Sequence, residues 1–128
     1  MDEEGRIELL VADDNETVRM QIKDYLGLDK SLRVVGEARD GQALIELAEE
    51  HKPDLVLMDL RMPKMDGFEA ARKLKQKYKD LRIIFLSMYD NDENRAEAKK
   101  LGADAYLIKG VPMQEVVNAI KKTSRKTV

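Results

Sequence analysis

Five short runs of apolar residues recur along the chain, and each run is typical of a strand buried inside a sheet. They cover residues 7–12, 32–35, 55–58, 83–86 and 105–108. Longer segments with apolar residues at helical spacing lie between them, such as the series Val18, Ile22 and Leu26 and the pair Ala71 and Leu74. The pattern predicts a strand followed by a helix, repeated five times.

Residues that commonly begin or end helices stand at the borders of these segments. Asn15 and Asp40 can cap helix starts, Gly102 can end a helix after Leu101, and Pro112 suits the first turn of the last helix. We find no linker-like stretch, and 128 residues is a normal length for one domain. We therefore expect a single domain spanning residues 1–128.

Strands that are apolar on both faces, each followed by a helix, indicate a parallel sheet covered by helices on both sides. Because crossover connections are right-handed, few strand orders remain. The expected fold class is α/β, a doubly wound, five-stranded parallel sheet with the flavodoxin-like order 2-1-3-4-5. The segment 91–101 is the least hydrophobic of the expected helices, so we predict that it is loosely held.

Composition and charge mainly exclude functions. A formal net charge of -2 favours neither nucleic acid nor anionic membranes, and we interpret the basic stretch 121–126 as a solvated helix end. The absence of cysteine excludes disulfides and thiolate metal sites. No apolar stretch reaches the roughly 18 residues of a membrane span, and the acidic start is unlike a signal peptide. We expect a cytoplasmic protein that binds neither membranes nor nucleic acid directly.

Polar residues directly follow four of the five apolar runs. In a parallel α/β sheet, ligands bind beyond the carboxyl ends of the strands. The residues at these ends are Asp13 and Asp14, then Asp59, Ser87 and Lys109. Singly, Asp14 is as well explained by a turn and Lys109 by a solvated side chain. Their conjunction is what indicates a site with three carboxylates, a hydroxyl and an ammonium group.

Three neighbouring carboxylates repel one another unless a cation compensates their charge. Mg²⁺ prefers oxygen ligands and is commonly held by one or two carboxylates together with a phosphate, and Mn²⁺ is a second candidate. An ionised carboxylate can attack phosphorus, while a metal ion and a lysine neutralise the transferring phosphoryl group. The strand ends therefore predict a metal-assisted phosphoryl-transfer site.

Four segments in chain order resemble the receiver domains of two-component response regulators. They are residues 12–15, 57–67, 86–87 and 102–109, and the resemblance covers nearly the whole chain. It implies that Asp59 accepts a phosphoryl group from the phosphohistidine of a sensor histidine kinase or phosphotransfer protein. It also implies that phosphorylation changes the surface of the last two helices and the last strand, and so controls an output.

The resemblance also implies roles for individual residues. The implied Mg²⁺ ligands are Asp14 and Asp59, the backbone carbonyl of Arg61 and, through a bound water, Asp13. Lys109 is expected to pair with a phosphoryl oxygen, and Ser87 is expected to move and hydrogen-bond another. Tyr106 stands at the position of the family's aromatic switch. The only catalysis implied is self-catalysed phosphoryl uptake and autodephosphorylation.

Two positions depart from the family pattern. Lys109 is followed by Gly110 where many relatives have proline, and a cis peptide is less expected there because a non-proline cis bond costs about 3 kcal/mol. Ser87 is followed by Met88 where many relatives have alanine, and this bulky residue could narrow access to the site.

The output that this chain controls is left open. Segments 34–38 and 86–88 look most like receivers that are joined to a DNA-binding helix-turn-helix domain. The resemblance therefore implies either an excised receiver that controls such a C-terminal domain or a stand-alone receiver that controls a separate output protein. A phosphorylation-dependent dimer also remains open.

Three other functions fit the pattern less well. An aspartyl-phosphate phosphatase-type enzyme would need a second Asp two residues after Asp59, where Arg61 stands, and room for a substrate-enclosing cap. A flavin carrier of the same fold has a loop rich in Ser, Thr and Gly after its first strand, whereas this chain has acids there. A phosphorylation-independent interaction module would not need the intact set of strand-end residues.

Overall fold

The computed structural model describes the backbone of residues 1–125 and the side chains of residues 1–123. Within this part of the chain, five strands alternate with five helices: β1 (Ile7–Ala12), α1 (Glu16–Leu26), β2 (Leu32–Ala38), α2 (Gly41–His51), β3 (Leu55–Met58), α3 (Gly67–Lys77), β4 (Arg82–Ser87), α4 (Asp92–Leu101), β5 (Ala105–Ile108) and α5 (Met113–Arg125). The strands form one parallel sheet in the order β2-β1-β3-β4-β5. The predicted fold class and strand order are confirmed.

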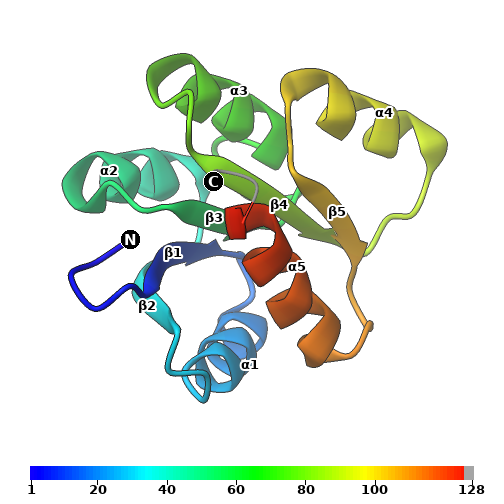
Figure 1. Ribbon diagram of the computed structural model, residues 1–128. Coiled ribbons are helices and arrows are strands. Elements are labelled where there is room, and N and C mark those ends of the chain that lie inside the picture. The colour runs from blue at the N-terminus through cyan, green and yellow to red at the C-terminus, as the bar shows by residue number, and fades with distance from the viewer. Residues whose placement is uncertain (126–128) are drawn as a thin grey trace.

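Helices cover both faces of the sheet, with α1 and α5 on one side and α2, α3 and α4 on the other (Figure 1). Two apolar clusters fill the space between these layers. Ile22 and Leu26 of α1 pack with Ile120 of α5 in one cluster, and Leu44 of α2 packs with Leu74 of α3 in the other. Because β3 lies at the centre, all four of its residues are buried, which explains why the apolar pattern predicted its bounds correctly.

Two strands extend beyond their predicted bounds. β4 is one residue longer at each end, and β2 continues from residue 35 to Ala38. β2 lies at the edge of the sheet and pairs only with β1, so it includes the half-buried Gly36 and Glu37, which interrupt the apolar pattern. A Cβ atom added to Gly36 would lie 3.0 Å from a terminal methyl group of Leu10, a tight contact.

Most of the predicted helix borders are confirmed. The Asn15 and Asp40 side chains accept hydrogen bonds from the N–H groups of Val18 and Ala43, at 3.0 and 2.8 Å. Gly102 ends α4 with a left-handed φ of 94°. Pro112 lies immediately before α5 rather than inside its first turn; its carbonyl accepts a hydrogen bond from Glu115 N–H at 2.9 Å.

Ala98 is the one residue of α4 that is buried, which agrees with the weak apolar pattern of this segment. α5 buries Val116, Val117 and Ile120.

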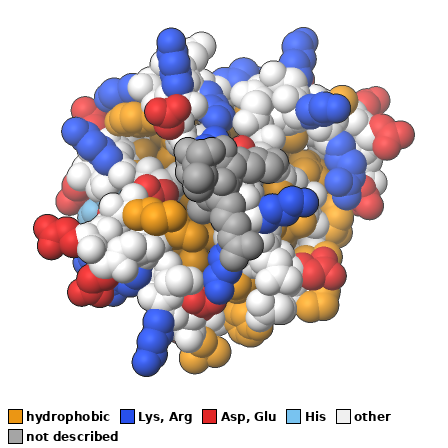
Figure 2. Space-filling model, viewed as in Figure 1, with side chains coloured by type: hydrophobic (Ala, Val, Ile, Leu, Met, Phe, Trp, Pro, Cys, Tyr) orange, Lys and Arg blue, Asp and Glu red, His pale blue; other side chains and the backbone are white. Residues whose placement is uncertain are grey.

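Basic and acidic side chains are interspersed on the face shown in Figure 2. None of the helices in the described residues has the length and apolar character of a membrane span. Of the basic stretch 121–126, residue 126 lies outside the described residues.

An ion pair ties the loop after α1 to α5. Lys121 Nζ lies 2.6 Å from Asp29 Oδ2, and Asp29 Oδ1 accepts hydrogen bonds from the N–H and hydroxyl groups of Ser31. The hydrogen bond from Lys121, followed by those from Ser31, lowers the pKa of Asp29 to about 2. Folding therefore favours the ionised form of Asp29. This contribution to stability is present above the ordinary pKa of 3.8 and is lost as the pH falls toward 2.

The Asp29→Asn variant should therefore unfold more easily than the wild type at neutral pH, by about 1 kcal/mol, because the pair is partly screened by solvent. The amide keeps an acceptor for Ser31 but removes the charge. The difference in urea unfolding free energy should shrink as the pH falls below 3.8. A difference that stays constant to the lowest pH at which both proteins fold would contradict this assignment.

Candidate functional site

Three strands bring three of the predicted site residues together at the carboxyl edge of the sheet. Asp13 follows β1, Asp59 follows β3 and Lys109 follows β5. The ammonium nitrogen of Lys109 lies 2.7 Å from Asp13 Oδ2 and 3.1 Å from Asp59 Oδ2. Asp13 and Asp59 are only 2% and 8% exposed. The parallel topology thus brings side chains that are far apart in sequence together in one buried ionic cluster.

Asp14 adds a third carboxylate to this cluster. One oxygen each from Asp13, Asp14 and Asp59 lies within 4.8 Å of the others, and Asp14 is exposed while the other two are buried. Three carboxylates face one ammonium group, so the cluster has an excess of negative charge. All three acids offer hard oxygen ligands at short range, and the donor set therefore fits a divalent cation such as Mg²⁺.

The environment changes the acid–base behaviour of Asp59 and Lys109. Burial raises the pKa of Asp59 and the neighbouring charge of Asp13 adds to this effect, while Lys109 opposes it. Burial alone would lower the pKa of Lys109, but its hydrogen bonds to Asp13 and Asp59 raise it overall. Lys109 therefore remains a cation at neutral pH. Additional positive charge beside Asp59 would favour the ionised form of its carboxyl group.

Backbone groups support the two buried acids. Asp13 Oδ1 accepts a hydrogen bond from Asn15 N–H at 2.9 Å, and Asp59 N–H donates to the Ala12 carbonyl at 2.9 Å. Arg61 N–H makes a longer contact of 3.4 Å with Asp59 Oδ1. Arg61 also lines a hollow beside Asp14, so this predicted site residue lies with the acids.

A family model described as the response regulator receiver domain matches residues 9–121. The chain belongs to this family. This finding confirms the resemblance that the strand-end motifs carried, and the site described above lies inside the matched residues.

Individual relatives agree with this assignment. The receiver domain is 35% identical over 118 residues to the transcriptional regulatory protein DegU of Brevibacillus brevis, covering 92% of this chain and 50% of that protein. It is similar to the signal receiver domain of NarL from Mycobacterium tuberculosis, with a TM-score of 0.88, 34% identity and coverage of 94% and 97%. A two-component response regulator of the LuxR family from an Aurantimonas species gives a TM-score of 0.87, 30% identity and coverage of 91% and 84%.

The names of these relatives agree with the subfamily that segments 34–38 and 86–88 resemble, since they include a transcriptional regulator and a LuxR-family response regulator. The chain spans about half the length of the curated relatives that it matches. The shared part is therefore the receiver domain.

Ser87 lies at the end of β4 next to this cluster, and it is fully buried. Its backbone carbonyl accepts a hydrogen bond from Lys109 N–H at 2.7 Å. Its hydroxyl oxygen accepts a hydrogen bond from Tyr89 N–H at 3.0 Å. The structure therefore brings Ser87 to the site and engages its hydroxyl with the loop that leads to α4.

Tyr106 holds the same loop from β5. Its ring lies 6.3 Å from that of Phe85, its hydroxyl donates to the carbonyl of Tyr89, and the Arg95 guanidinium lies 5.0 Å above the ring. Ser87 thus accepts a hydrogen bond from the backbone N–H of Tyr89, and Tyr106 donates one to the carbonyl of the same residue. Sequence reasoning missed Tyr89, because nothing in the apolar pattern marks the conformation of this loop.

Tyr89, rather than Met88, lines the hollow beside Asp14. The guanidinium of Arg61 lies 4.3 Å from the centre of the Tyr89 ring, whereas Met88 is 73% exposed. Tyr89 is therefore the bulky residue beside the site, and Met88 does not contribute to the lining of this hollow. The peptide bond between Lys109 and Gly110 is trans, and Gly110 has a left-handed φ of 105°.

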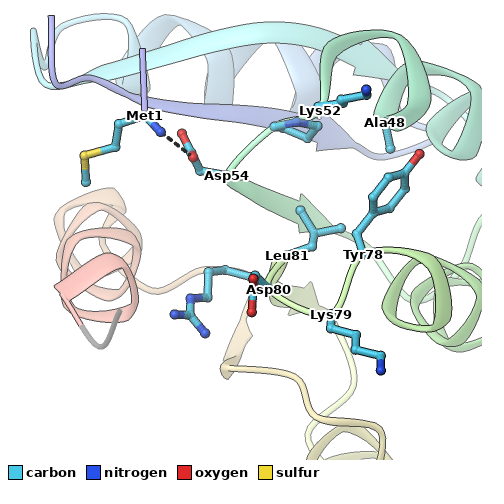
Figure 3. A pocket seen from close by; sticks show the side chains of 10 residues that line it. Met1, Ala48, Lys52, Asp54, Tyr78, Lys79, Asp80 and Leu81 are labelled. Atoms are coloured by element: carbon cyan, nitrogen blue, oxygen red, sulfur yellow. Dashed lines mark hydrogen bonds and ion pairs between the residues drawn. The ribbon is translucent and has the colours of Figure 1, made fainter. Parts of the chain in front are cut away.

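Another pocket of the receiver domain lies away from these residues, at the opposite edge of the sheet (Figure 3). Ala48 and Leu81 contribute to its apolar lining, and the ammonium group of Met1 lies 2.7 Å from Asp54 Oδ1 at its border. Its lining includes none of the predicted site residues. The carboxyl edge of the sheet therefore remains the candidate site.

Gly67 supports the receiver site although sequence reasoning assigned it no role of its own. It begins α3, and its N–H donates to the Leu60 carbonyl at 2.7 Å. A Cβ atom at this position would lie 2.4 Å from the carbonyl oxygen of Asp59 and 2.8 Å from Leu60 Cα. Only glycine therefore lets α3 approach the backbone of Asp59 this closely. The Asp66-Gly67 pair before a helix was the available signal.

The Gly67→Ala variant should lose about 2 kcal/mol of unfolding free energy, because the added methyl group collides with backbone that cannot rotate away. Urea unfolding measures this loss. Gly27→Ala is the matched control, since Gly27 has an ordinary φ of -66° and its added Cβ would come no closer than 3.2 Å to Lys23 O. Equal losses in the two variants would show that the contact with Asp59 does not matter.

Proposed function

We propose that this receiver domain accepts a phosphoryl group on Asp59 from the phosphohistidine of a sensor histidine kinase or phosphotransfer protein. The observation that carries the proposal is the position of Lys109 Nζ, within hydrogen-bonding distance of both Asp13 and Asp59 at the edge of three strands. Asp59 is the acid of this cluster that follows the central strand β3, with Asp13 and Lys109 on either side.

The chemistry follows from these contacts. An oxygen of the Asp59 carboxylate forms the new bond to phosphorus while the bond between phosphorus and the donor imidazole breaks. Lys109 provides positive charge next to the attacking oxygen, where it can pair with a phosphoryl oxygen. Asp13 orients Lys109 through its contact of 2.7 Å. The only catalysis proposed is self-catalysed phosphoryl uptake and the later hydrolysis of the acyl phosphate.

Mg²⁺, or Mn²⁺ with the same oxygen ligands, is the proposed cofactor. The residues that would hold it are Asp14 and Asp59 directly, Arg61 through its backbone carbonyl and Asp13 through a water. When bound, the ion supplies positive charge to the phosphoryl oxygens. The excess of carboxylates over ammonium groups in the cluster supports this assignment.

The proposed signal passes through Tyr89. A phosphoryl oxygen on Asp59 attracts the Ser87 hydroxyl, which then no longer accepts the hydrogen bond from Tyr89 N–H. The loop remains attached to Tyr106, whose hydroxyl bonds the Tyr89 carbonyl, so rearrangement of the loop is coupled to Tyr106. Because α4 is held by little buried surface, it can follow at small cost in free energy.

We propose that the output partner recognises the surface formed by α4, β5 and α5. Since the named relatives include a transcriptional regulator about twice the length of this chain, the output is proposed to be a C-terminal DNA-binding domain or a separate output protein. Phosphorylation-dependent pairing of two receivers is a further proposed consequence. We place the whole process in the cytoplasm, where histidine kinases present their phosphodonor sites.

The test is intact-mass measurement after treatment with acetyl phosphate and Mg²⁺. The wild type should gain the mass of one phosphoryl group, which base should remove, and Asp59→Asn should gain none. Asp66→Asn is the matched control, because the amide still caps α3 and the phosphoacceptor is kept. Peptide mapping that finds the phosphoryl group on Asp13, Asp14 or a hydroxyl residue would overturn the assignment.

A further inference from the structure

Arg19 of α1 lies next to the backbone of Asp13. Its side chain is only 12% exposed, which is unusual for arginine. Its Nη1 donates a hydrogen bond of 2.7 Å to the backbone carbonyl of Asp13. Its Nε donates a hydrogen bond of 3.0 Å to Glu37 Oε1 at the end of β2. One guanidinium group therefore links the edge strand to the residue at the end of β1.

Glu37 keeps this guanidinium in place. Its other carboxylate oxygen contacts the ammonium group of Lys23, one turn further along α1. The hydrogen bonds from Lys23 and then Arg19 lower the pKa of Glu37, so it stays ionised at neutral pH. Lys23 and Arg19 both contact Glu37. Of these two residues, Arg19 is the one that donates a hydrogen bond to the carbonyl of Asp13.

The carbonyl group of Asp13 matters because a peptide unit is planar. The oxygen of Asp13 and the nitrogen and Cα of Asp14 lie in one plane, so a bond to that oxygen also restricts the position of Asp14. Asp13 is already held by other bonds: its N–H donates to the Ala38 carbonyl, and its side chain contacts Asn15 and Lys109. Asp14 is exposed, so its placement depends on the backbone that carries it.

We propose that Arg19 is a positioning residue that, through the carbonyl of Asp13, holds Asp14 where its carboxylate can share a divalent cation with Asp13 and Asp59. Glu37 anchors the guanidinium. The inference rests on the proposed function, since it takes the cluster to be a Mg²⁺ site. The described contacts of Arg19 are with the backbone carbonyl of Asp13 and the carboxylate of Glu37, and not with the carboxylates of the cluster.

Electrostatics alone predicts that removal of Arg19 strengthens cation binding, whereas a positioning role predicts that it weakens cation binding. Loss of a positive charge near a cation site should strengthen cation binding. If Arg19 acts by positioning Asp14, its removal should weaken binding instead, and the sign of the change separates the two explanations. Lys23→Met is the matched control, because it removes a positive charge and an ion pair to Glu37 while leaving the bond to Asp13 in place.

The experiment is calorimetric titration of the whole chain with Mg²⁺ alone, with urea unfolding of each variant as a check on folding. Arg19→Met should bind Mg²⁺ about tenfold more weakly than the wild type, the usual size of effect for a group that orients a metal ligand. Lys23→Met should bind within about twofold of the wild type, because charge screened by solvent has a small effect. Arg19→Lys should recover part of the affinity, since an ammonium group can donate to one acceptor but lacks the planar fork that reaches two.

Several results would overturn the inference. A folded Arg19→Met variant that binds Mg²⁺ as the wild type does, or a Lys23→Met variant that loses as much affinity, would exclude a positioning role. If Arg19→Met does not fold, Glu37→Gln tests the anchor: unchanged affinity there contradicts the inference, and a loss of about threefold supports it. A wild type without Mg²⁺ affinity would overturn the proposed cofactor as well, so the two failures are distinguishable.

Discussion

Lys109 bridges two carboxylates that folding has largely removed from water, and the rest of the site depends on this contact. Moving ions from water into the protein interior costs several kcal/mol each unless opposite charges compensate. One ammonium group at 2.7 and 3.1 Å from Asp13 and Asp59 compensates the two acids only in part. Asp14 adds a third carboxylate at the solvent side. The cluster is therefore suited to gain a cation and then a phosphoryl group.

The neighbouring structure holds these charged groups in position. Gly67 lets α3 pack directly against the backbone of Asp59, and Arg19 holds the backbone of Asp13 from the other side. Ser87 and Tyr106 hold Tyr89 in the loop before α4. Backbone contacts thus hold the chain at Asp13 and Asp59, while hydrogen bonds with Ser87 and Tyr106 hold the loop before α4. We propose that a change in charge at Asp59 moves that loop because few contacts hold it.

Sequence reasoning could find the fold and the central acids for the same physical reason. β3 is covered on both faces, so its four residues are all apolar, and the change to Asp59 marks where the strand ends. The supporting residues carry no such signal. Arg19 and Glu37 are 18 positions apart, and Glu37 lies in the part of β2 that was not predicted because an edge strand tolerates polar residues. The contacts of Tyr89 depend on a loop conformation that periodicity does not describe.

We propose that the charge at Asp59 controls the loop that Ser87 and Tyr106 hold. The most direct measurement is amide-resolved NMR of the wild type with Mg²⁺, before and after addition of beryllofluoride, a mimic of the phosphoryl group. We expect shifts at Asp59 together with shifts at Ser87, Tyr89 and Tyr106 and along α4, and no such shifts in Asp59→Asn. Shifts confined to the Asp59 pocket, with residues 87–109 unchanged, would contradict it.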